Sequence, residues 1–249
     1  MADLHIHSTL SPCGSLEMSP TAIVNRANEL GLNLIAITDH NAIENGYYAG
    51  KIAKRFDISI IYGLEAQTEE EIHTLIFFDA YEQVYEFYKV IYPKLPDILN
   101  VPEHFGDQVV VDENDEIIRT EKKLLLNSFT MSVDELYSLV QEYGGLCIPA
   151  HVDQESYSII AQLGFIPKHL DFKAVEISYI ATEEEILRRF PFLRKYTLVS
   201  FSDAHYLQDI GRVYTEFYLN SPSIKEIKKA LRKEEGRYSR IVRKQGGYI

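Results

Sequence analysis

Short apolar runs alternate with amphipathic helical patterns along most of the 249-residue chain, and this alternation constrains the fold more than any other feature. Such a repeat is typical of strand-helix units that build a mostly parallel sheet or a barrel. The expected strands cover residues 2–6, 33–37, 58–64, 72–78, 145–150, 174–177, 198–201 and 213–219. The expected helices cover residues 20–30, 44–56, 132–143, 183–189 and 223–234. A chain of this length suits one barrel-sized α/β domain over residues 1–249.

Residues 80–131 interrupt this rhythm. An aromatic-rich helical stretch at 81–92 is followed by three prolines and by a hairpin pattern at 108–119, whose turn holds Asp112 to Asp115. A long insertion in a barrel is commonly a lid or binding loop, and a structural elaboration is an equal alternative. Its aromatic rings can stack on a base or pack a lid. We expect the insertion to shape substrate access and to hold no metal.

Composition limits which binding partners and which cellular compartment are expected. The chain has 25 Lys+Arg against 37 Asp+Glu, a formal net charge of −12. Because non-specific DNA affinity comes from Lys and Arg on phosphates, no stable duplex DNA binding is expected. Only Cys13 and Cys147 are present, which argues against a disulfide framework and for a reducing compartment. We expect no secretory signal and no membrane-spanning helix, and therefore a cytoplasmic protein.

Histidines recur beside acids at the ends of the expected strands. His5 and His7 lie two apart on the first strand, so both imidazoles point to the same face. In a strand-helix repeat the strand ends converge on one face, where such folds build their active sites. A hydrogen-bonded core or surface role accounts equally well for any single histidine, but poorly for the whole set. The set, with its acids, is His5, His7, Asp39, His40, Glu65, His73, His151, Asp203 and His205.

These donors indicate a metal centre. Imidazole and carboxylate without thiolate suit zinc, manganese or iron, and several such residues together suit a multinuclear hydrolytic site. His104 and His169 lie in Pro-flanked polar segments and are interpreted as ordinary surface residues.

The motifs resemble one family across almost the whole chain. Asp3-Leu4-His5-Ile6-His7-Ser8, Thr38-Asp39-His40-Asn41 and Ser202-Asp203-Ala204-His205, with His73 and His151 between them, are similar to the motifs of the PHP family, the polymerase and histidinol phosphatase domains. The resemblance implies a distorted seven-stranded (β/α) barrel, two or three divalent metal ions, and phosphoester hydrolysis.

The resemblance also implies a ligand set. His5, His7, Glu65 and Asp203 would hold one ion, Glu65 would bridge to a second held by His73 and His151, and His40 and His205 would belong to a third. Pro12 stands where many members have an acid or a histidine, and proline offers no donor atom. The third ion is therefore expected to be absent, weakly held, or held by Cys13 or Glu17 as a substitute.

Four further residues near these motifs are interpreted one by one. Asp39 is expected to orient the site from behind a ligand. Arg212 is predicted to bind a substrate phosphate through its planar fork, with an ordinary surface arginine as the alternative. Glu176 faces either the metal end or the barrel interior. Cys147 belongs to the core.

The predicted function is metal-dependent phosphoester hydrolysis. A metal-bound hydroxide attacks phosphorus, and Asp203 and His205 handle the proton delivered to the leaving group. The expected substrate is a small phosphomonoester, a nucleotide, or the end of a short oligonucleotide. Two alternatives remain: an amidohydrolase-like C–N hydrolase, although no expected strand ends in the bridging Lys usual there, and a non-catalytic metal-bearing interaction module. The nearly complete ligand set favours catalysis.

Overall fold

The computed structural model, which describes residues 1–244, contains the expected strands and helices, except that the expected strand at 58–64 is divided at Ile61 between two strands of separate sheets. The strands are β1 (Ala2–Ile6), β2 (Leu34–Ile37), β3 (Ser59–Ile60), β4 (Tyr62–Gln67), β5 (His73–Phe78), β6 (Val109–Val111), β7 (Ile117–Thr120), β8 (Leu146–Pro149), β9 (Ala174–Glu176), β10 (Thr197–Val199), β11 (Val213–Tyr218) and β12 (Tyr238–Arg243). The helices are α1 (Pro20–Glu29), α2 (Glu44–Ala53), α3 (Tyr81–Ile91), α4 (Pro102–Phe105), α5 (Val133–Glu142), α6 (Ile159–Leu163), α7 (Glu183–Arg189) and α8 (Ile224–Arg232). Short 3₁₀ turns lie at η1 (Tyr92–Lys94), η2 (Pro191–Lys195) and η3 (Leu207–Asp209).

Local sequence signals set the ends of the main helices. Ser19 caps α1 by accepting a hydrogen bond from the backbone N–H of Ala22, and Pro20 occupies the first turn. At α5, Ser132 and Glu135 form a reciprocal capping box. No helix among residues 1–244 is both long enough and apolar enough to cross a bilayer.

The strands form a mixed α/β arrangement, as expected, but among residues 1–244 they do not close into one hydrogen-bonded barrel. Among the described residues the hydrogen-bonded orders are β12-β11-β1-β2-β3, β4-β5-β8, β10-β9 and β6-β7. Strand β5 is antiparallel to both β4 and β8. Its reversal relative to β4 follows from the short connection at residues 68–72, because a parallel crossover needs a dozen or more residues. Single bridges, Ile6 to Ala204 and His40 to Glu65, connect strand ends between separate sheets.

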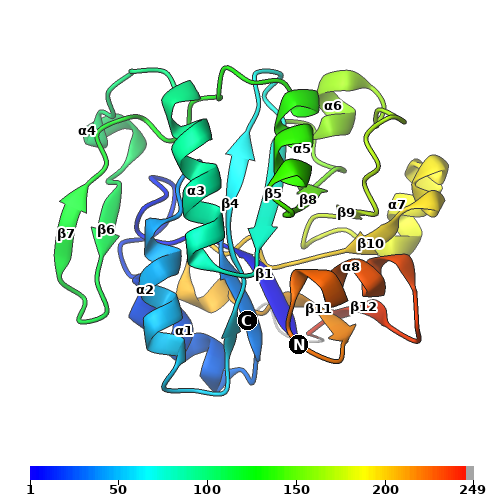
Figure 1. Cartoon of the computed structure of the whole chain (residues 1–249), viewed down its shortest axis with the longest axis horizontal. Helices are drawn as coiled ribbons and strands as arrows, with labels where there is room; N and C mark the ends of the chain where they lie inside the picture. The colour runs from blue at the N-terminus through cyan, green and yellow to red at the C-terminus, as the bar shows by residue number, and fades with distance from the viewer. Residues whose placement is uncertain (245–249) are drawn as a thin grey trace.

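Helices cover the outer faces of these strands. Figure 1 shows β4 and β5 in the middle of the molecule with α3 and α5 on either side. The rings of Phe78 on β5 and Phe87 on α3 are fully buried, with centroids 5.2 Å apart. Burying one such side chain contributes about 1.5–3 kcal/mol relative to exposure. This packing fixes the strands whose ends carry the histidines.

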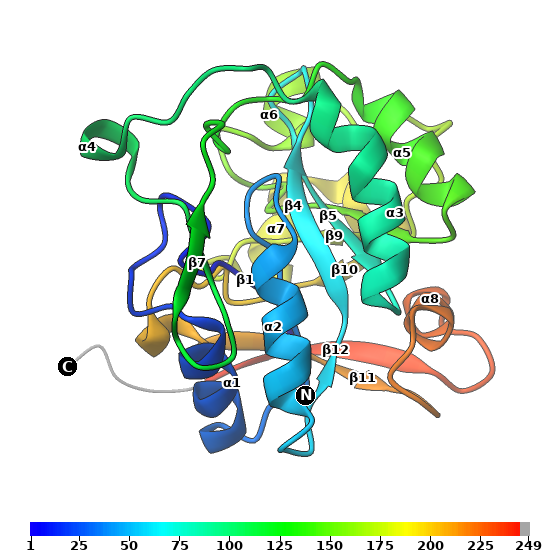
Figure 2. The same ribbon diagram turned by 60° about the vertical axis from the view of Figure 1, so that its left-hand side comes forward.

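The expected hairpin of the 80–131 segment is present as β6 and β7. It stands at one edge of the molecule beside α2 (Figure 2). Strand β6 is buried, and the backbone N–H of Val109 donates to the carbonyl of Thr9. Strand β7 is exposed along its whole length. The segment therefore contacts the loop that follows β1.

Candidate metal centre

The structure brings all eight predicted ligands together at one end of the strands. His5 is on β1, Glu65 on β4, and His7, His40, His151, Asp203 and His205 lie in segments that follow β1, β2, β8 and β10. His73 is the first residue of β5, and it pairs with Gln67 at the end of β4 because the two strands are antiparallel. Because β5 runs antiparallel to β4, its first residue, His73, lies at the same end as the residues that follow the other strands.

The carboxylate of Glu65 is the centre of the cluster. It is 1% exposed, and five imidazole nitrogens face it. The distances to its oxygens are 3.3 Å for His5 Nε2, 3.4 Å for His7 Nε2, 3.0 Å for His40 Nδ1, 3.0 Å for His73 Nδ1 and 3.2 Å for His151 Nε2. Asp203 adds a second carboxylate, with one oxygen 3.5 Å from His5 Nε2 and 3.4 Å from His7 Nε2.

Hydrogen bonds on the far side of two imidazoles fix where their protons lie. Both carboxylate oxygens of Glu176 are 3.1 Å from His5 Nδ1, so Nδ1 carries the proton. The hydroxyl of Ser11 donates to Asp39, so it accepts from His7 Nδ1 at 2.9 Å. The Nε2 atoms of His5 and His7 therefore both present lone pairs, only 3.2 Å apart.

His73 follows the same arrangement. Its Nε2 lies 3.1 Å from the amide oxygen of Gln67, an acceptor, so its Nδ1 presents a lone pair to Glu65. The buried Nδ1 of His151 has no hydrogen-bond partner among the described residues, and that of His40 faces Glu65 at 3.0 Å without hydrogen-bond geometry. A buried polar atom left unpaired costs about 1–3 kcal/mol. Lone pairs that converge on a carboxylate repel it unless a cation lies between them.

Divalent metal ions fit this donor set. The separation of 3.2 Å between His5 Nε2 and His7 Nε2 is what two metal–nitrogen bonds of about 2.0–2.1 Å span at a near-tetrahedral angle. Donor atoms within 4.8 Å of one another form three groups: His5, His7 and Glu65; His40, Glu65 and His73; and His7, Cys13, His40 and His205. His151 and Asp203 border these groups through Glu65, His5 and His7.

The ionisation of the two carboxylates agrees with a cation site. Without a metal ion, burial would raise the pKa of Glu65, and positive charge on His73, His5 and His40 would hold that pKa well below its ordinary value. Burial would likewise raise the pKa of Asp203, and positive charge on His5 and His7 would lower it. A divalent cation among neutral imidazoles would supply the same positive charge, so both carboxylates fit a cation site.

Asp39 lies behind the cluster. It accepts hydrogen bonds from the backbone and hydroxyl of Ser8, both at 2.6 Å, and from the hydroxyl of Ser11 at 2.7 Å. Through Ser11 it fixes the proton of His7. This geometry fits the orienting role predicted for Asp39, which stays a prediction.

The sequence leaves the role of Glu176 open and gives no indication of a role for Tyr157. The structure answers the open question about Glu176: it faces the metal end, binding His5 and accepting from the backbone N–H of His151. Tyr157 was not anticipated at all. Its ring stacks on His73 with centroids 4.7 Å apart, its φ is +57°, and its side chain is 43% exposed. A tyrosine in a polar loop carries no sequence signal for such a role.

Arg212 contacts the last motif. Its Nε donates to the carbonyl of Ser202 at 2.8 Å and its Nη2 to that of Asp203 at 3.1 Å, while the guanidinium lies over the ring of Tyr179. These contacts hold the loop that carries Asp203. A phosphate contact from Arg212 stays a prediction.

The loop after β1 supplies a thiol to the cluster. Cys13 is exposed and groups with His7, His40 and His205, whereas Glu17 is exposed and belongs to none of the three donor groups. Burial of the thiolate would raise the pKa of Cys13, but His40 and His205 lower it to about 6.

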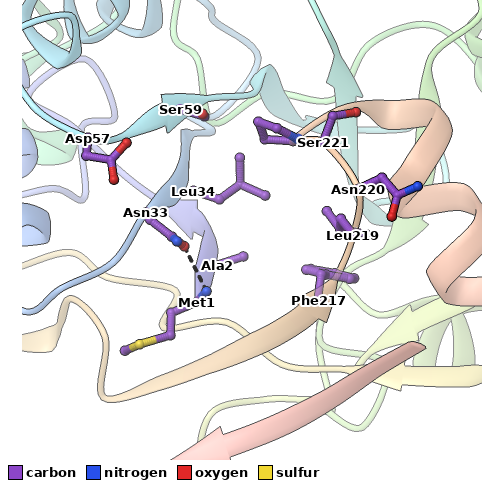
Figure 3. Close-up of a pocket in the computed structure, with 11 residues that line it drawn as sticks. Met1, Ala2, Asn33, Leu34, Asp57, Ser59, Phe217, Leu219, Asn220 and Ser221 are labelled. Atoms are coloured by element: carbon purple, nitrogen blue, oxygen red, sulfur yellow. Dashed lines mark hydrogen bonds between the residues drawn. The ribbon is translucent and has the colours of Figure 1, made fainter. Parts of the chain in front are cut away.

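A separate cavity lies at the opposite ends of the strands. It encloses about 310 Å³ and is lined by Met1 and Ala2, Asn33 and Leu34, and the end of β11 (Figure 3). The amino group of Met1 donates to Asn33 Oδ1 at 2.8 Å on its wall. Since β1 and β2 begin here and the histidines lie beyond their other ends, this cavity is not part of the metal centre.

Comparison with known proteins identifies the family. Residues 3–163 match the PHP domain, and residues 193–235 match the PHP-associated family. The chain belongs to the PHP domain family. The resemblance seen in the motifs is thus confirmed, and family membership together with the donor set indicates a metal-dependent hydrolase, as predicted.

Similar proteins share the fold over most of this chain. The lesion-specific endonuclease Q of Pyrococcus furiosus is 20% identical, with a TM-score of 0.72 over 96% of this chain and 57% of that chain. An amidohydrolase of Chromobacterium violaceum is 18% identical, with a TM-score of 0.58 over 97% of both chains. The uncharacterized protein YqxK of Bacillus subtilis is 25% identical across 95% of this chain and 62% of its own length. The chain thus spans about three fifths of endonuclease Q and of YqxK.

One expectation about partners is wrong. The acidic net charge predicted no stable duplex DNA partner, and the partner expected from the predicted function was a small phosphorylated substrate or nucleotide. Endonuclease Q, however, has been solved with a 27-mer duplex that has an abasic lesion at the active site, and that structure aligns with 95% of this chain at a TM-score of 0.72 and 19% identity. Net charge sums over the whole surface, whereas a substrate is bound by the local charges of a site.

Proposed function

We propose that this chain hydrolyses a phosphodiester bond in DNA, using divalent metal ions held by the cluster around Glu65. The observation that carries the proposal is the pair of Nε2 lone pairs of His5 and His7, 3.2 Å apart and facing two ionised carboxylates. The fold shared with endonuclease Q supports DNA as the substrate class.

The donors divide among two or three ions of zinc, manganese or iron. His5, His7, Glu65 and Asp203 would hold one ion, and Glu65 with His73 and His151 would hold a second. His40 and His205 belong to a third position. Such ions polarise phosphoryl oxygens and acidify water at neutral pH.

The residues around the ions orient the ligands and move protons. Glu176 and Asp39, the latter through Ser11, hold the His5 and His7 rings in the tautomer that presents Nε2. The side chains of Asp203 and His205 are 20% and 27% exposed, whereas Glu65 and His5 are buried. Asp203 and His205 therefore reach the substrate and are the candidates for proton transfer to the leaving oxygen.

Two further elements face the substrate. The exposed ring of Tyr157 beside His73 is a platform on which a base can stack. The 80–131 segment, one part of a single domain over residues 1–249, borders the loop of Pro12 and shapes access to the cluster. A Cβ placed on Gly106 of this segment would come within 2.0 Å of the Pro12 carbonyl, so the two backbones are in close contact.

A cleavage assay tests the proposal. Protein loaded with Mn²⁺ or Zn²⁺ is incubated with a duplex carrying one abasic site, the undamaged duplex, the single strand, a phosphomonoester and an amide substrate. We expect strand cleavage that chelation abolishes and added metal restores. Hydrolysis of the amide alone would favour the amidohydrolase alternative. Full metal content with no hydrolysis of any substrate would favour the interaction module.

A further inference from the structure

Cys13 reaches the metal centre because its loop is tightly constrained. The backbone N–H of Gly14 donates to the carbonyl of Ser11, and that of Ser15 donates to the carbonyl of His205 at 2.9 Å. A Cβ on Gly14 would lie 2.5 Å from the Ser8 carbonyl, so only glycine fits at this point of the turn. The loop is thus bound directly to the segment that carries His205, and the thiol faces the imidazoles.

Three donors at this end of the cluster are not assigned to the first or the second proposed ion. The group contains His7, Cys13, His40 and His205 within 4.8 Å of one another. His7, however, has only Nε2 available, because Ser11 binds its Nδ1, and that Nε2 faces Glu65 and Asp203. Cys13, His40 and His205 remain. His40 is 7% exposed, and its Nδ1 lies 3.0 Å from a Glu65 oxygen, so Nε2 is the nitrogen left for this position.

We propose that Cys13, His40 and His205 bind a zinc or ferrous ion, with the Cys13 thiolate as the ligand that Pro12 cannot provide. One thiolate and two imidazoles are a borderline-soft donor set, which favours Zn²⁺ or Fe²⁺ over Mn²⁺ and Mg²⁺. Three protein ligands leave one coordination position open, the arrangement found at catalytic sites.

The location of this ion suits a role in hydrolysis. That role rests on the proposed function. The rings of His7 and His205 stack with centroids 4.3 Å apart, so the thiolate position adjoins the first metal position. Cys13 is exposed, and the open coordination position therefore faces the side from which a phosphate oxygen arrives.

Cobalt substitution tests the ligand directly. Metal-free protein is titrated with Co²⁺, and the sulfur-to-cobalt charge-transfer band is followed in the near ultraviolet. The variants are Cys13→Ser and, as the matched control, Cys147→Ala, which removes the buried thiol of β8. We expect the band in the parent and in Cys147→Ala. In Cys13→Ser we expect the band to disappear and the protein to bind one ion fewer per chain. A band that persists in Cys13→Ser, or none in fully loaded parent protein, would overturn the proposal.

A second variant tests selectivity. Cys13→Asp replaces the thiolate with a hard oxygen donor, so we expect Zn²⁺ affinity at this site to fall at least about tenfold while Mn²⁺ affinity is kept or improved. Equal losses for both ions would contradict a thiolate-selected site. Neither readout requires DNA cleavage: cobalt binding through Cys13 without nuclease activity would refute only the proposed function, and cleavage without the band would refute only this inference.

Discussion

Glu65 is the residue on which the metal centre depends most. Its carboxylate faces five imidazoles, so replacing it with a neutral amide removes the charge that balances the ions and the oxygen proposed to bridge them. We expect Glu65→Gln to lose at least one ion per chain and to lower hydrolysis by more than about 100-fold. Metal analysis and single-turnover cleavage on the same preparation measure both effects.

The control for this variant is Glu69→Gln, an exposed residue in the turn after β4. It should keep full metal content and full activity. Unfolding temperatures of both variants show whether each remains folded. Full loading and activity in Glu65→Gln would remove Glu65 from the proposed ligand set.

Glu176 is expected to act through His5. Glutamine offers one acceptor oxygen in place of two, and Glu176 serves both His5 Nδ1 and the backbone N–H of His151. We expect Glu176→Gln to weaken metal affinity by about 10–100-fold while saturating metal restores most of the activity. Competition with a chelating dye measures the affinity. An activity loss that excess metal does not correct would indicate a role in packing instead.

The candidate ligands were predictable from sequence because each lies in or beside a short apolar run, and position relative to a strand is a local property. Supporting contacts were not. Glu176 is 171 residues from His5, and nothing near Glu176 in the chain indicates that the two meet. The thiol of Cys13 was an open alternative to Glu17 until the turn at Gly14 placed it among the imidazoles.

At the scale of elements, the sequence pattern predicts where the strands lie but not how they pair. The run at 72–78 looks the same whether it is parallel or antiparallel, and only the short connection to β4 forces the reversal. Strand β12 was missed because Tyr238 to Arg243 are half-exposed and polar, as suits the edge of a sheet. Closure of a barrel depends on such pairing choices, and it was therefore the weakest part of the fold prediction.

The hairpin of the 80–131 segment gives a prediction at this scale. Removing the whole hairpin would disturb the Thr9 loop, because β6 is buried against it. The exposed Ile117 and Ile118 on β7 are better targets, with side chains 69% and 49% exposed. If the hairpin contacts DNA, changing both to serine should raise KM about three- to tenfold and leave kcat and metal content unchanged.

Steady-state kinetics on the abasic duplex test this expectation, with Phe192→Ser in η2 as an exposed apolar control. Unchanged kinetics with a lower unfolding temperature would make the segment a structural support. That outcome would leave the metal centre assignment intact and would remove the hairpin from the substrate path.

For the whole molecule, the acidic balance predicts how the proposed DNA binding responds to metal and to salt. With 25 Lys+Arg against 37 Asp+Glu, the long-range field of the chain repels phosphates. Attraction must therefore come from ions held by the Glu65 cluster and from stacking on Tyr157. Few phosphates would be neutralised by protein side chains, and each would contribute about −0.9 to the slope of log K against log salt.

We accordingly expect an abasic duplex with an uncleavable phosphorothioate at the lesion to bind with a shallow slope of about −1 to −3. Chelation should weaken this binding at least about tenfold, because it removes the cations that offset the net charge of −12. Fluorescence anisotropy measures both effects, with the undamaged duplex as the reference and circular dichroism to verify that the chelated protein stays folded. A steep slope that persists after chelation would mean that a basic surface away from the Glu65 cluster carries the affinity, and that the metal ions serve cleavage alone.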